Sequence, residues 1–289
     1  MGRLANKLVL GTAQLGLKYG ISNKSGKPSK AESFKILDFA YKNGISIFDT
    51  AHAYGDAENI LGEFLQKKGI RKEIKIITKC ENPLKDPEES FKRLKTDYID
   101  ALLFHNPDCI KNKLLIDRMV DLKRTGRVKH IGVSVYDVKD AIFAAKFDSI
   151  DYIQIPYNIF DQRLDKTDFF KLTKKNKKKV FGRSVFLQGL LFMADKEIPL
   201  SIKKAKVYLS RLDKIIAKHN LSRRQIALQF LLKNKNIDYV VLGVDNITQI
   251  KENIDIVNQN IDCDKCIKEI RNKFANIEKK IISPNLWKK

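Results

Sequence analysis

The sequence lacks the features of a protein that spans a membrane or depends on disulfides. None of its apolar runs reaches the roughly 18 residues that a helix needs to cross a bilayer. The first residues include a cation but no long apolar stretch ending in small residues, so we expect no secretory signal. Four cysteines in 289 residues are too few for a disulfide scaffold, which favours a reducing, cytoplasmic location.

Patterns typical of metal sites are also scarce. Cys263 and Cys266 form a lone C-x-x-C pair. A structural zinc site needs four ligands, and no second pair or flanking histidine supplies the other two. We therefore expect no metal in this protein.

Acidic residues are in short supply, because 34 Asp and Glu stand against 56 Lys and Arg and give a formal net charge of +22. Such an excess attracts polyanions, so a nucleic-acid partner has to be weighed. The densest basic run, residues 174–179, contains no aromatic residue on which a base could stack. We interpret the charge as a solvated surface and expect neither a nucleic-acid nor a membrane partner.

Low-complexity linkers and abrupt changes of composition are absent, so residues 1–289 are expected to form a single domain. Hydrophobic residues make up 43 % of the chain, which is enough for a sizeable core. Length alone would suggest two domains at roughly 150 residues each, but α/β barrels commonly run about 250 residues as one domain.

Short apolar runs rich in Ile and Val alternate with longer helical patterns along the chain. The runs have the length and composition of buried parallel strands, which we predict at residues 8–12, 45–49, 74–79, 99–105, 128–134, 152–156, 180–184 and 239–243. Helices are predicted after them at residues 31–43, 58–67, 88–95, 113–125, 138–146, 164–175, 203–219 and 248–257. Eight strands, each followed by a helix, predict an α/β fold of the (β/α)8 TIM-barrel type.

Three segments fall outside this repeat. Residues 222–234 are predicted to form a helix under the last strand, and residues 193–202 a loop over the site. Residues 260–289 are expected to add a C-terminal helix, at 261–280, and a Pro-containing tail. A doubly wound open sheet is the architectural rival. It is disfavoured because the first strand-to-helix turn has no G-x-G-x-x-G and eight repeats exceed what such a sheet usually carries.

Polar residues close most of the predicted strands. They are Asp49, Lys79, His105 and Ser134 after strands two to five, Gln154 near the end of strand six, and Arg183 and Ser184 after strand seven. In a TIM barrel these ends surround one mouth, where the chemistry takes place. Core packing does not explain so many polar ends, so we predict a polar, charged site there. The basic run at 174–179 precedes a strand and is expected on the opposite face.

The segment 48–55, FDTAHAYG, followed by Lys79 and by His105 in LLFH, resembles the aldo-keto reductases. The resemblance covers nearly the whole chain, from LGT at residues 10–12 to QIKEN at 249–253. It implies a barrel enzyme that reduces aldehydes or ketones with a nicotinamide cofactor, usually NADPH, and without a metal. It also implies that the catalytic residues are Asp49, Tyr54, Lys79 and His105.

These residue types suit carbonyl reduction, which needs a hydride on carbon and a proton on oxygen. A phenol with an unperturbed pKa of about 10 is a reluctant donor near neutrality. A lysine ammonium within hydrogen-bond reach of Tyr54 would lower that pKa, and Asp49 would keep Lys79 charged and in place. His105 would hydrogen-bond the carbonyl oxygen and orient it. His52 either contacts substrate or shapes the loop.

The resemblance also implies a set of cofactor-binding residues. Ser134 and Gln154 would hold the nicotinamide carboxamide, and the planar guanidinium of Arg183 would stack on the nicotinamide ring. The full set is Thr12, Asp49, Ser134, Gln154 and Arg183, with Ser184, Leu187 and Gly189 along the pyrophosphate, and Gly243, Asp245, Gln249, Glu252 and Asn253 at the adenosine end.

The choice between the two nicotinamide cofactors depends on opposing features. Residues 243–249 contain no Lys or Arg that could grip a 2′-phosphate, and the carboxylate of Asp245 would favour a free ribose diol, as in NADH. The positive field of the whole chain and the habit of the family favour NADPH. We expect a modest preference for NADP(H) over NAD(H).

The substrate is expected to be a small carbonyl compound. Residues 11–20, GTAQLGLKYG, are similar to a bacterial subgroup associated with sugar metabolism, so a sugar or sugar derivative is expected. The alternative is a cofactor-binding regulatory or interaction subunit that keeps the fold and turns over little. The sequence carries no signal for the oligomeric state.

Overall fold

The computed structural model describes residues 5–287. At its centre are eight strands: β1 (Leu8–Gly11), β2 (Ile47–Asp49), β3 (Lys75–Cys80), β4 (Ile99–Phe104), β5 (Val128–Ser134), β6 (Tyr152–Pro156), β7 (Lys179–Arg183) and β8 (Tyr239–Gly243). Each strand pairs in parallel with the next, and β8 pairs with β1, so the sheet closes into a barrel. The predicted (β/α)8 TIM barrel is confirmed, and each of the predicted strands is present.

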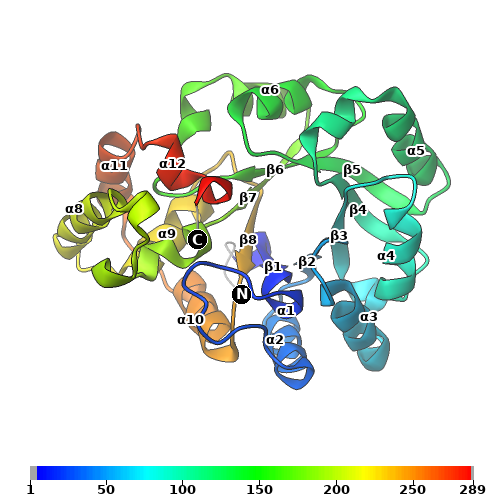
Figure 1. Ribbon diagram of the computed structural model, residues 1–289, viewed down its shortest axis with the longest axis horizontal. Coiled ribbons are helices and arrows are strands. Elements are labelled where there is room, and N and C mark those ends of the chain that lie inside the picture. The colour runs from blue at the N-terminus through cyan, green and yellow to red at the C-terminus, as the bar shows by residue number, and fades with distance from the viewer. Residues whose placement is uncertain (1–4, 288–289) are drawn as a thin grey trace.

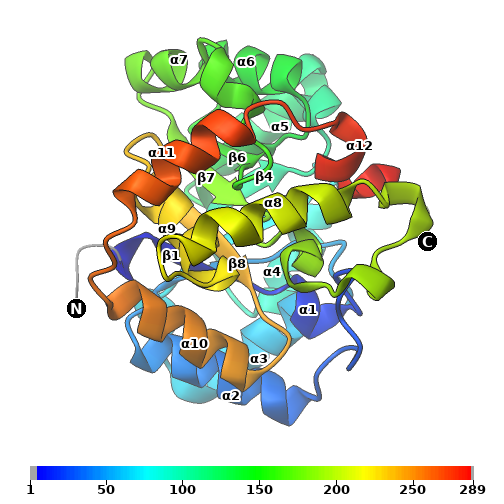
Figure 2. The ribbon, with the colours of Figure 1, turned by 90° about the vertical axis from the view of Figure 1, so that its left-hand side faces the viewer.

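Helices surround the barrel (Figure 1). They are α1 (Ala13–Gly16), α2 (Lys30–Lys42), α3 (Ala57–Lys68), α4 (Asp86–Leu94), α5 (Lys113–Arg124), α6 (Val138–Lys146), α7 (Phe169–Lys175), α8 (Ala205–Ala217), α9 (Arg223–Leu232), α10 (Ile247–Asn258), α11 (Asp264–Lys273) and α12 (Lys279–Ile282). Helix α10 lies beside α2, so the last repeat meets the first (Figure 2). No helix between residues 5 and 287 is long and apolar enough to cross a membrane.

Alternation along the strands divides the apolar side chains into two cores. Successive side chains of a strand point to opposite faces of the sheet. Val9, Ile77 and Leu103 belong to a cluster inside the barrel, whereas Leu10 and Phe48 pack against the helices. Because the barrel interior is filled in this way, a ligand has to bind at the ends of the strands.

Local sequence signals set the helix ends. Ser29 caps α2, because its side chain accepts from the Glu32 backbone while the Glu32 carboxylate accepts from the Ser29 backbone. This capping box starts the helix at Lys30, one residue before the expected start. Gly69 ends α3 in the left-handed conformation, with φ of 70°.

Two of the predicted helices are interrupted. In place of a helix at 164–175 there is a 3-10 turn, Arg163–Lys166, and then α7, because the Thr167 side chain turns the chain by accepting from the Phe169 backbone at 3.2 Å. The predicted helix at 261–280 divides into α11 and α12. Phe274 ends α11, where its buried ring packs edge to face on Phe160 at 5.0 Å.

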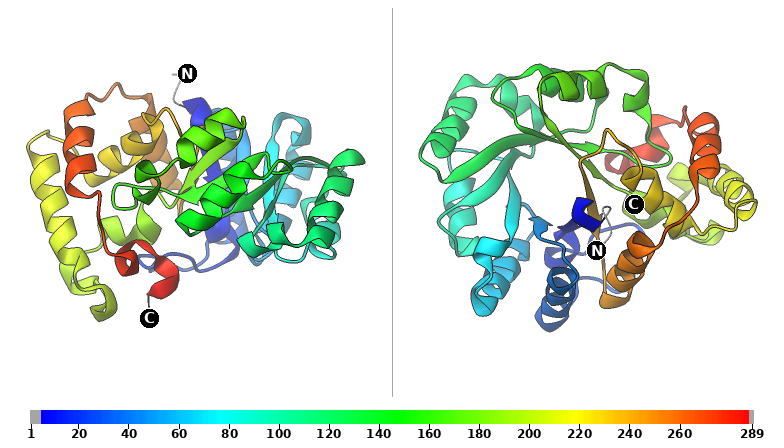
Figure 3. Two further views of the ribbon diagram at one scale, coloured as in Figure 1. Left: turned by 90° about the horizontal axis from the view of Figure 1, so that it is seen from above. Right: turned by 180° about the vertical axis from the view of Figure 1, so that it is seen from behind.

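The remaining segments complete the outer layer. The predicted loop at 193–202 contains two 3-10 turns, Asp195–Glu197 and Leu200–Ile202. Helices α8 and α11 lie side by side on the outside of the barrel (Figures 1 and 3). The predicted domain includes residues 1–4, and the predicted tail includes residues 288 and 289. These residues lie outside the described part of the chain.

Candidate active site

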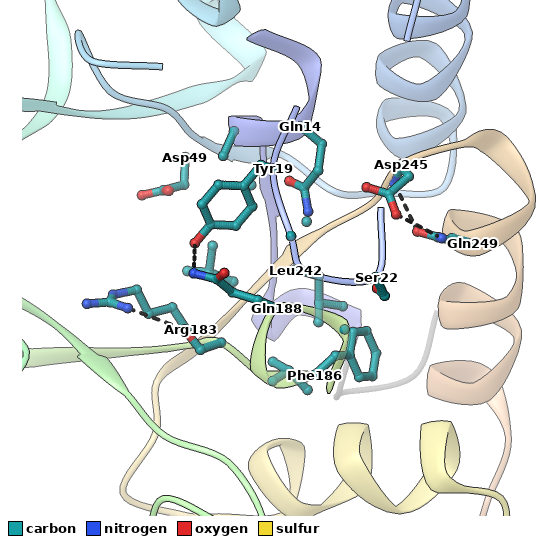
Figure 4. A pocket seen from close by; sticks show the side chains of 18 of the residues that line it. Gln14, Tyr19, Ser22, Asp49, Arg183, Phe186, Gln188, Leu242, Asp245 and Gln249 are labelled. Atoms are coloured by element: carbon teal, nitrogen blue, oxygen red, sulfur yellow. Dashed lines mark hydrogen bonds between the residues drawn. The ribbon is translucent and has the colours of Figure 1, made fainter. Parts of the chain in front are cut away.

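The carboxyl ends of the strands surround a pocket at the mouth of the barrel. Asp49 and Arg183 lie at one end of it, and Asp245 and Gln249 at the other (Figure 4). The wall between them includes Phe186 and comes mainly from the loops after β1 and β7. The pocket therefore has two polar ends joined by a partly aromatic middle.

A buried ion pair lies at the first of these ends. Lys79 Nζ donates to Asp49 Oδ2 at 2.7 Å and to the Thr50 carbonyl at 2.8 Å. Gln154 Nε2 donates to the other oxygen, Asp49 Oδ1, at 2.7 Å. The side chains of Lys79 and Asp49 are 1 % and 4 % exposed. Burial lowers the pKa of Lys79, and the Asp49 carboxylate acts against this by stabilising the ammonium.

Tyr54 lies over this ion pair, on the loop that joins β2 to α3. Lys79 Nζ is 4.9 Å from the centroid of the Tyr54 ring. The His105 ring, after β4, packs edge to face on Tyr54 with the ring centroids 5.8 Å apart. The structure thus brings together all four residues predicted to be catalytic, Asp49, Tyr54, Lys79 and His105.

The electrostatic environment of Tyr54 differs from the one expected. Burial raises the pKa of Tyr54 above its ordinary value of 10.0; Asp49 adds to this, and Arg183 opposes it. Within residues 5–287, Lys79 donates hydrogen bonds to Asp49 and to the Thr50 carbonyl and none to the Tyr54 hydroxyl. The expected lowering of this pKa is absent because burial is the largest cause of the shift and Asp49 acts in the same direction. Tyr54 therefore holds its proton at neutral pH.

His105 is a neutral imidazole at neutral pH. Burial, together with the charges of Lys79 and Arg183, lowers its pKa from 6.5 to about 4. In the described part of the chain, its Nδ1 atom is buried without a hydrogen-bond partner and lies 3.9 Å from Glu81 Oε1. A neutral ring with a nitrogen to spare can hydrogen-bond a small ligand beside Tyr54.

Close backbone contacts hold the Tyr54 loop in place. Helix α1 approaches it so closely that a Cβ added to Gly16 would lie 1.8 Å from the Tyr54 carbonyl oxygen. Gly55 has a positive φ of 52°, and a Cβ added to it would lie 2.5 Å from the Gly16 carbonyl oxygen. The His52 backbone N–H also donates to the Lys79 carbonyl at 2.9 Å, which ties the loop to β3.

The side chain of His52 lies outside the residues that line the pocket. Arg93 Nη1 donates to the His52 carbonyl at 3.2 Å and lies 3.4 Å from its Nδ1 atom. The buried carboxylate of Glu58 accepts from Thr78 at 2.7 Å and lies 3.9 Å from the same ring. Of the two roles left open for His52, this geometry favours shaping the loop.

The predicted cofactor residues fall into two groups. Those that line the pocket are Asp49, Gln154, Arg183, Ser184, Gly189, Gly243, Asp245 and Gln249. Those outside its lining are Thr12, Ser134, Leu187, Glu252 and Asn253. Thr12 is buried with its hydroxyl donating to the Asp49 carbonyl at 3.1 Å, while Ser134 and Leu187 are buried within the barrel wall and the apolar core.

Glu252 and Asn253 bind a residue that the sequence did not single out. Arg224, near the start of α9, lies 3.1 Å from Glu252 Oε2 and donates to Asn253 Oδ1 at 3.0 Å. Its guanidinium lies 4.7 Å from the Phe192 ring and 5.5 Å from the Phe186 ring, on the pocket wall. No motif marks Arg224, because it reaches the pocket only through the packing of α9.

Two glycines and a contact between loops shape the middle of the pocket. A Cβ on Gly243 would lie 2.3 Å from the Gln14 side chain, and one on Gly189 would lie 1.7 Å from Ser22 Oγ. These glycines keep the channel open between its two ends. Tyr19 accepts from Gln188 Nε2 at 3.1 Å, which joins the loops after β1 and β7 along one wall (Figure 4). Asp245 and Arg224 also line the pocket and bring opposite charges to it.

Metal chemistry has no corresponding site among residues 5–287. No group of three or more His, Cys, Asp or Glu side chains in this range could hold a metal ion. Cys263 and Cys266 are free and buried at the start of α11.

Comparisons with known proteins identify a family, relatives and solved structures to which this chain is similar. The model of the Aldo/keto reductase family matches residues 7–273. Aldo-keto reductase str7 of Strobilurus tenacellus is 27 % identical, covering 85 % of this chain and 81 % of that protein. L-galactose dehydrogenase of Arabidopsis thaliana is 26 % identical, covering 81 % of this chain and 80 % of that protein. The structure of aldo-keto reductase AKR11C1 from Bacillus halodurans, in its holo form, has a TM-score of 0.76 at 23 % identity and 94 % coverage of both chains.

The contact between α1 and the Tyr54 loop yields a first prediction. Gly16→Ala places a methyl group against the Tyr54 carbonyl. We therefore expect it to lower the free energy of unfolding by about 1–3 kcal/mol. The displaced loop should also lower kcat by about tenfold to a hundredfold. Urea unfolding and steady-state carbonyl reduction measure the two effects.

Gly69→Ala is the matched control, because its Cβ would meet nothing within 4 Å and its only strain is φ of 70°. Gly69→Ala should lower the free energy of unfolding by about 1 kcal/mol and leave kcat unchanged. An unaltered kcat in Gly16→Ala would show that the close contact does not set the position of Tyr54.

Proposed function

This chain belongs to the aldo/keto reductase family, and we propose that it reduces a sugar or sugar-derived aldehyde or ketone to an alcohol, with NADPH as the preferred reductant. As a member of the family it is an NAD(P)H-dependent oxidoreductase. The observation that carries the proposal is the buried Lys79–Asp49 pair beneath Tyr54 and His105 at the mouth of the barrel. The name of the Arabidopsis relative supports a sugar-type substrate.

Tyr54 is the proposed proton donor. When bound, the nicotinamide cofactor supplies the hydride that goes to the carbonyl carbon. Tyr54 gives its hydroxyl proton to the carbonyl oxygen, where negative charge develops. The neutral ring of His105 donates a hydrogen bond to the same oxygen and holds it towards Tyr54.

Lys79 and Asp49 act on the state that follows proton transfer. The phenolate of Tyr54 is then the group that needs stabilisation, and the Lys79 ammonium lies 4.9 Å from its ring. Asp49 keeps the ammonium charged at a buried site, and Gln154 fixes the second carboxylate oxygen. The pair thus places a buried cation beside the ring of Tyr54, where the phenolate would form.

The cofactor preference rests on two opposite charges at the distal end of the pocket. Asp245 opposes a 2′-phosphate, and burial raises the pKa of its carboxyl group. Arg224 would attract that phosphate, although Glu252 offsets part of its charge. With the +22 net charge drawing anions to the protein, we propose a modest preference for NADPH.

Replacing Tyr54 tests the proposed proton donor. Tyr54→Phe should lower kcat by at least about a hundredfold, because no other group replaces the hydroxyl, while NADPH affinity stays within a few-fold. Cofactor titration and a panel of sugar aldehydes measure the two quantities. Tyr41→Phe is the control: it removes a hydroxyl bonded to Glu73 on the outer surface and should change neither.

Full activity in Tyr54→Phe would exclude Tyr54 as the donor. A wild-type protein that binds NADPH and reduces no carbonyl of the panel would instead favour a cofactor-binding subunit with little turnover.

The shifted pKa values predict a broad pH profile. A proton donor works only while protonated, so its activity is lost as pH rises through its pKa. Since burial raises the pKa of Tyr54 above 10.0, kcat/KM should stay level up to about pH 10 and should fall only at higher pH. On the acid side, His105 becomes charged only near its pKa of about 4. A basic limb below pH 9 would show that Lys79 does lower the Tyr54 pKa.

Asp245 provides the test of cofactor preference. The dissociation constant of NADPH should be below that of NADH in the wild type, and Asp245→Asn should widen the ratio several-fold by removing a negative charge near the 2′-phosphate. Fluorescence titration of both cofactors measures this ratio. Wild-type affinities that favour NADH at least tenfold would overturn the NADPH preference.

A further inference from the structure

Arg183 is a partly buried cation without a carboxylate partner at the catalytic end of the pocket. Its Nη2 donates to the Val135 carbonyl at 3.1 Å and its Nη1 to Ser184 Oγ at 3.3 Å. The guanidinium lies 4.3 Å from the centroid of the Tyr136 ring. Among the ion pairs within 4 Å that the described residues form, none includes Arg183. It therefore carries a full charge that neutral groups hold in position.

The other charges at this end cancel or are screened. Lys79 and Asp49 form a buried pair, and Tyr54 and His105 are neutral at pH 7 for the reasons given above. Glu81, the acidic residue beside His105, is 68 % exposed, so water screens its charge. Asp245 lies at the opposite end of the pocket (Figure 4). The catalytic end thus has a net charge of about +1, supplied by Arg183.

The position of the nicotinamide follows from the chemistry, and this step rests on the proposed function. Hydride must reach the carbon whose oxygen takes the proton of Tyr54, and reacting atoms have to lie roughly 3–3.5 Å apart. The ring therefore belongs at the end of the pocket lined by Tyr54 and Arg183. Its two redox states differ in charge, because the reduced dihydropyridine is neutral and the oxidised pyridinium carries +1.

We propose that Arg183 makes the pocket bind the reduced, neutral cofactor more tightly than the oxidised, cationic one. A fixed positive charge repels the pyridinium and leaves the dihydropyridine almost unaffected. At separations of several ångströms and a protein-like dielectric, the repulsion corresponds to an affinity ratio on the order of tenfold to a hundredfold.

The preference has a direct consequence for turnover. Oxidised cofactor, formed when the hydride leaves, is expelled by the repulsion and makes room for the reduced form. Each tenfold preference also raises the reduction potential of the bound two-electron couple by about 30 mV. Arg183 thereby helps the carbonyl-reducing cycle at product release.

Two other roles of Arg183 would give a different signature. Stacking on the nicotinamide ring, or contact with a phosphate of the cofactor, would strengthen both redox states to a similar degree. The ratio of the two dissociation constants, and not either constant alone, therefore identifies the electrostatic role.

The test measures that ratio by isothermal titration calorimetry with NADPH and NADP+. For the wild-type protein we expect the dissociation constant of NADP+ to exceed that of NADPH by at least tenfold. Arg183→Gln, which is polar but uncharged, should lower this ratio by about tenfold or more. Arg183→Lys keeps the charge and should keep most of the ratio. Arg211→Gln, which removes an exposed cation on α8, should leave it unchanged.

Several outcomes would overturn the proposal. They are a wild-type ratio near one, an unchanged ratio in Arg183→Gln, and an equal loss of affinity for both redox states. A wild-type ratio near one overturns the proposal even where Arg183→Gln does not fold, and Arg183→Lys then tests the role of the charge. If the wild type bound neither cofactor, both the proposed function and this inference would be wrong. If the wild type bound NADPH and NADP+ with equal affinity, the inference about Arg183 would be wrong and the proposed function would stand.

Discussion

The buried ion pair between Lys79 and Asp49 is the constraint on which the rest of the site depends. Removing one partner from such a pair typically costs 3–5 kcal/mol, because it leaves an uncompensated charge in the interior. Asp49 ends β2, Lys79 lies in β3, and Gln154 reaches the same carboxylate from β6 across the barrel. The closure of the barrel is what brings these three strand ends together, so the fold and the site are specified by the same interactions.

The ion pair also decides how its neighbours behave. Burial is the largest cause of the raised pKa of Tyr54, and the Asp49 carboxylate raises it further. Tyr54 therefore keeps its proton at neutral pH. The same carboxylate supports the charged form of Lys79 against burial.

The barrel could be predicted because it depends on local patterns, and the four catalytic candidates followed from the resemblance of residues 48–55, Lys79 and His105 to a known family. Strand and helix periodicities are visible in short windows, and a polar residue at a strand end falls at the mouth of any barrel. Arg224 could not be found in this way. It lies on α9, and its contacts with Glu252 and Asn253 depend on how α9 packs beside α10. The pKa of Tyr54 was misjudged for a similar reason, because it depends on burial and on the partner of its neighbour.

The net charge of +22 attracts an anionic cofactor to the protein, but it does not determine how the cofactor is recognised. Recognition depends on a few charges that the fold leaves paired or unpaired. Elsewhere on the pocket lining, Arg224 is paired with Glu252, and Asp245 adds a carboxylate. At the catalytic end, Arg183 has no such partner among the described residues, and its charge acts on the ring whose own charge changes during the reaction. The same residue type thus has different consequences at the two ends, because only one of the two cations is compensated.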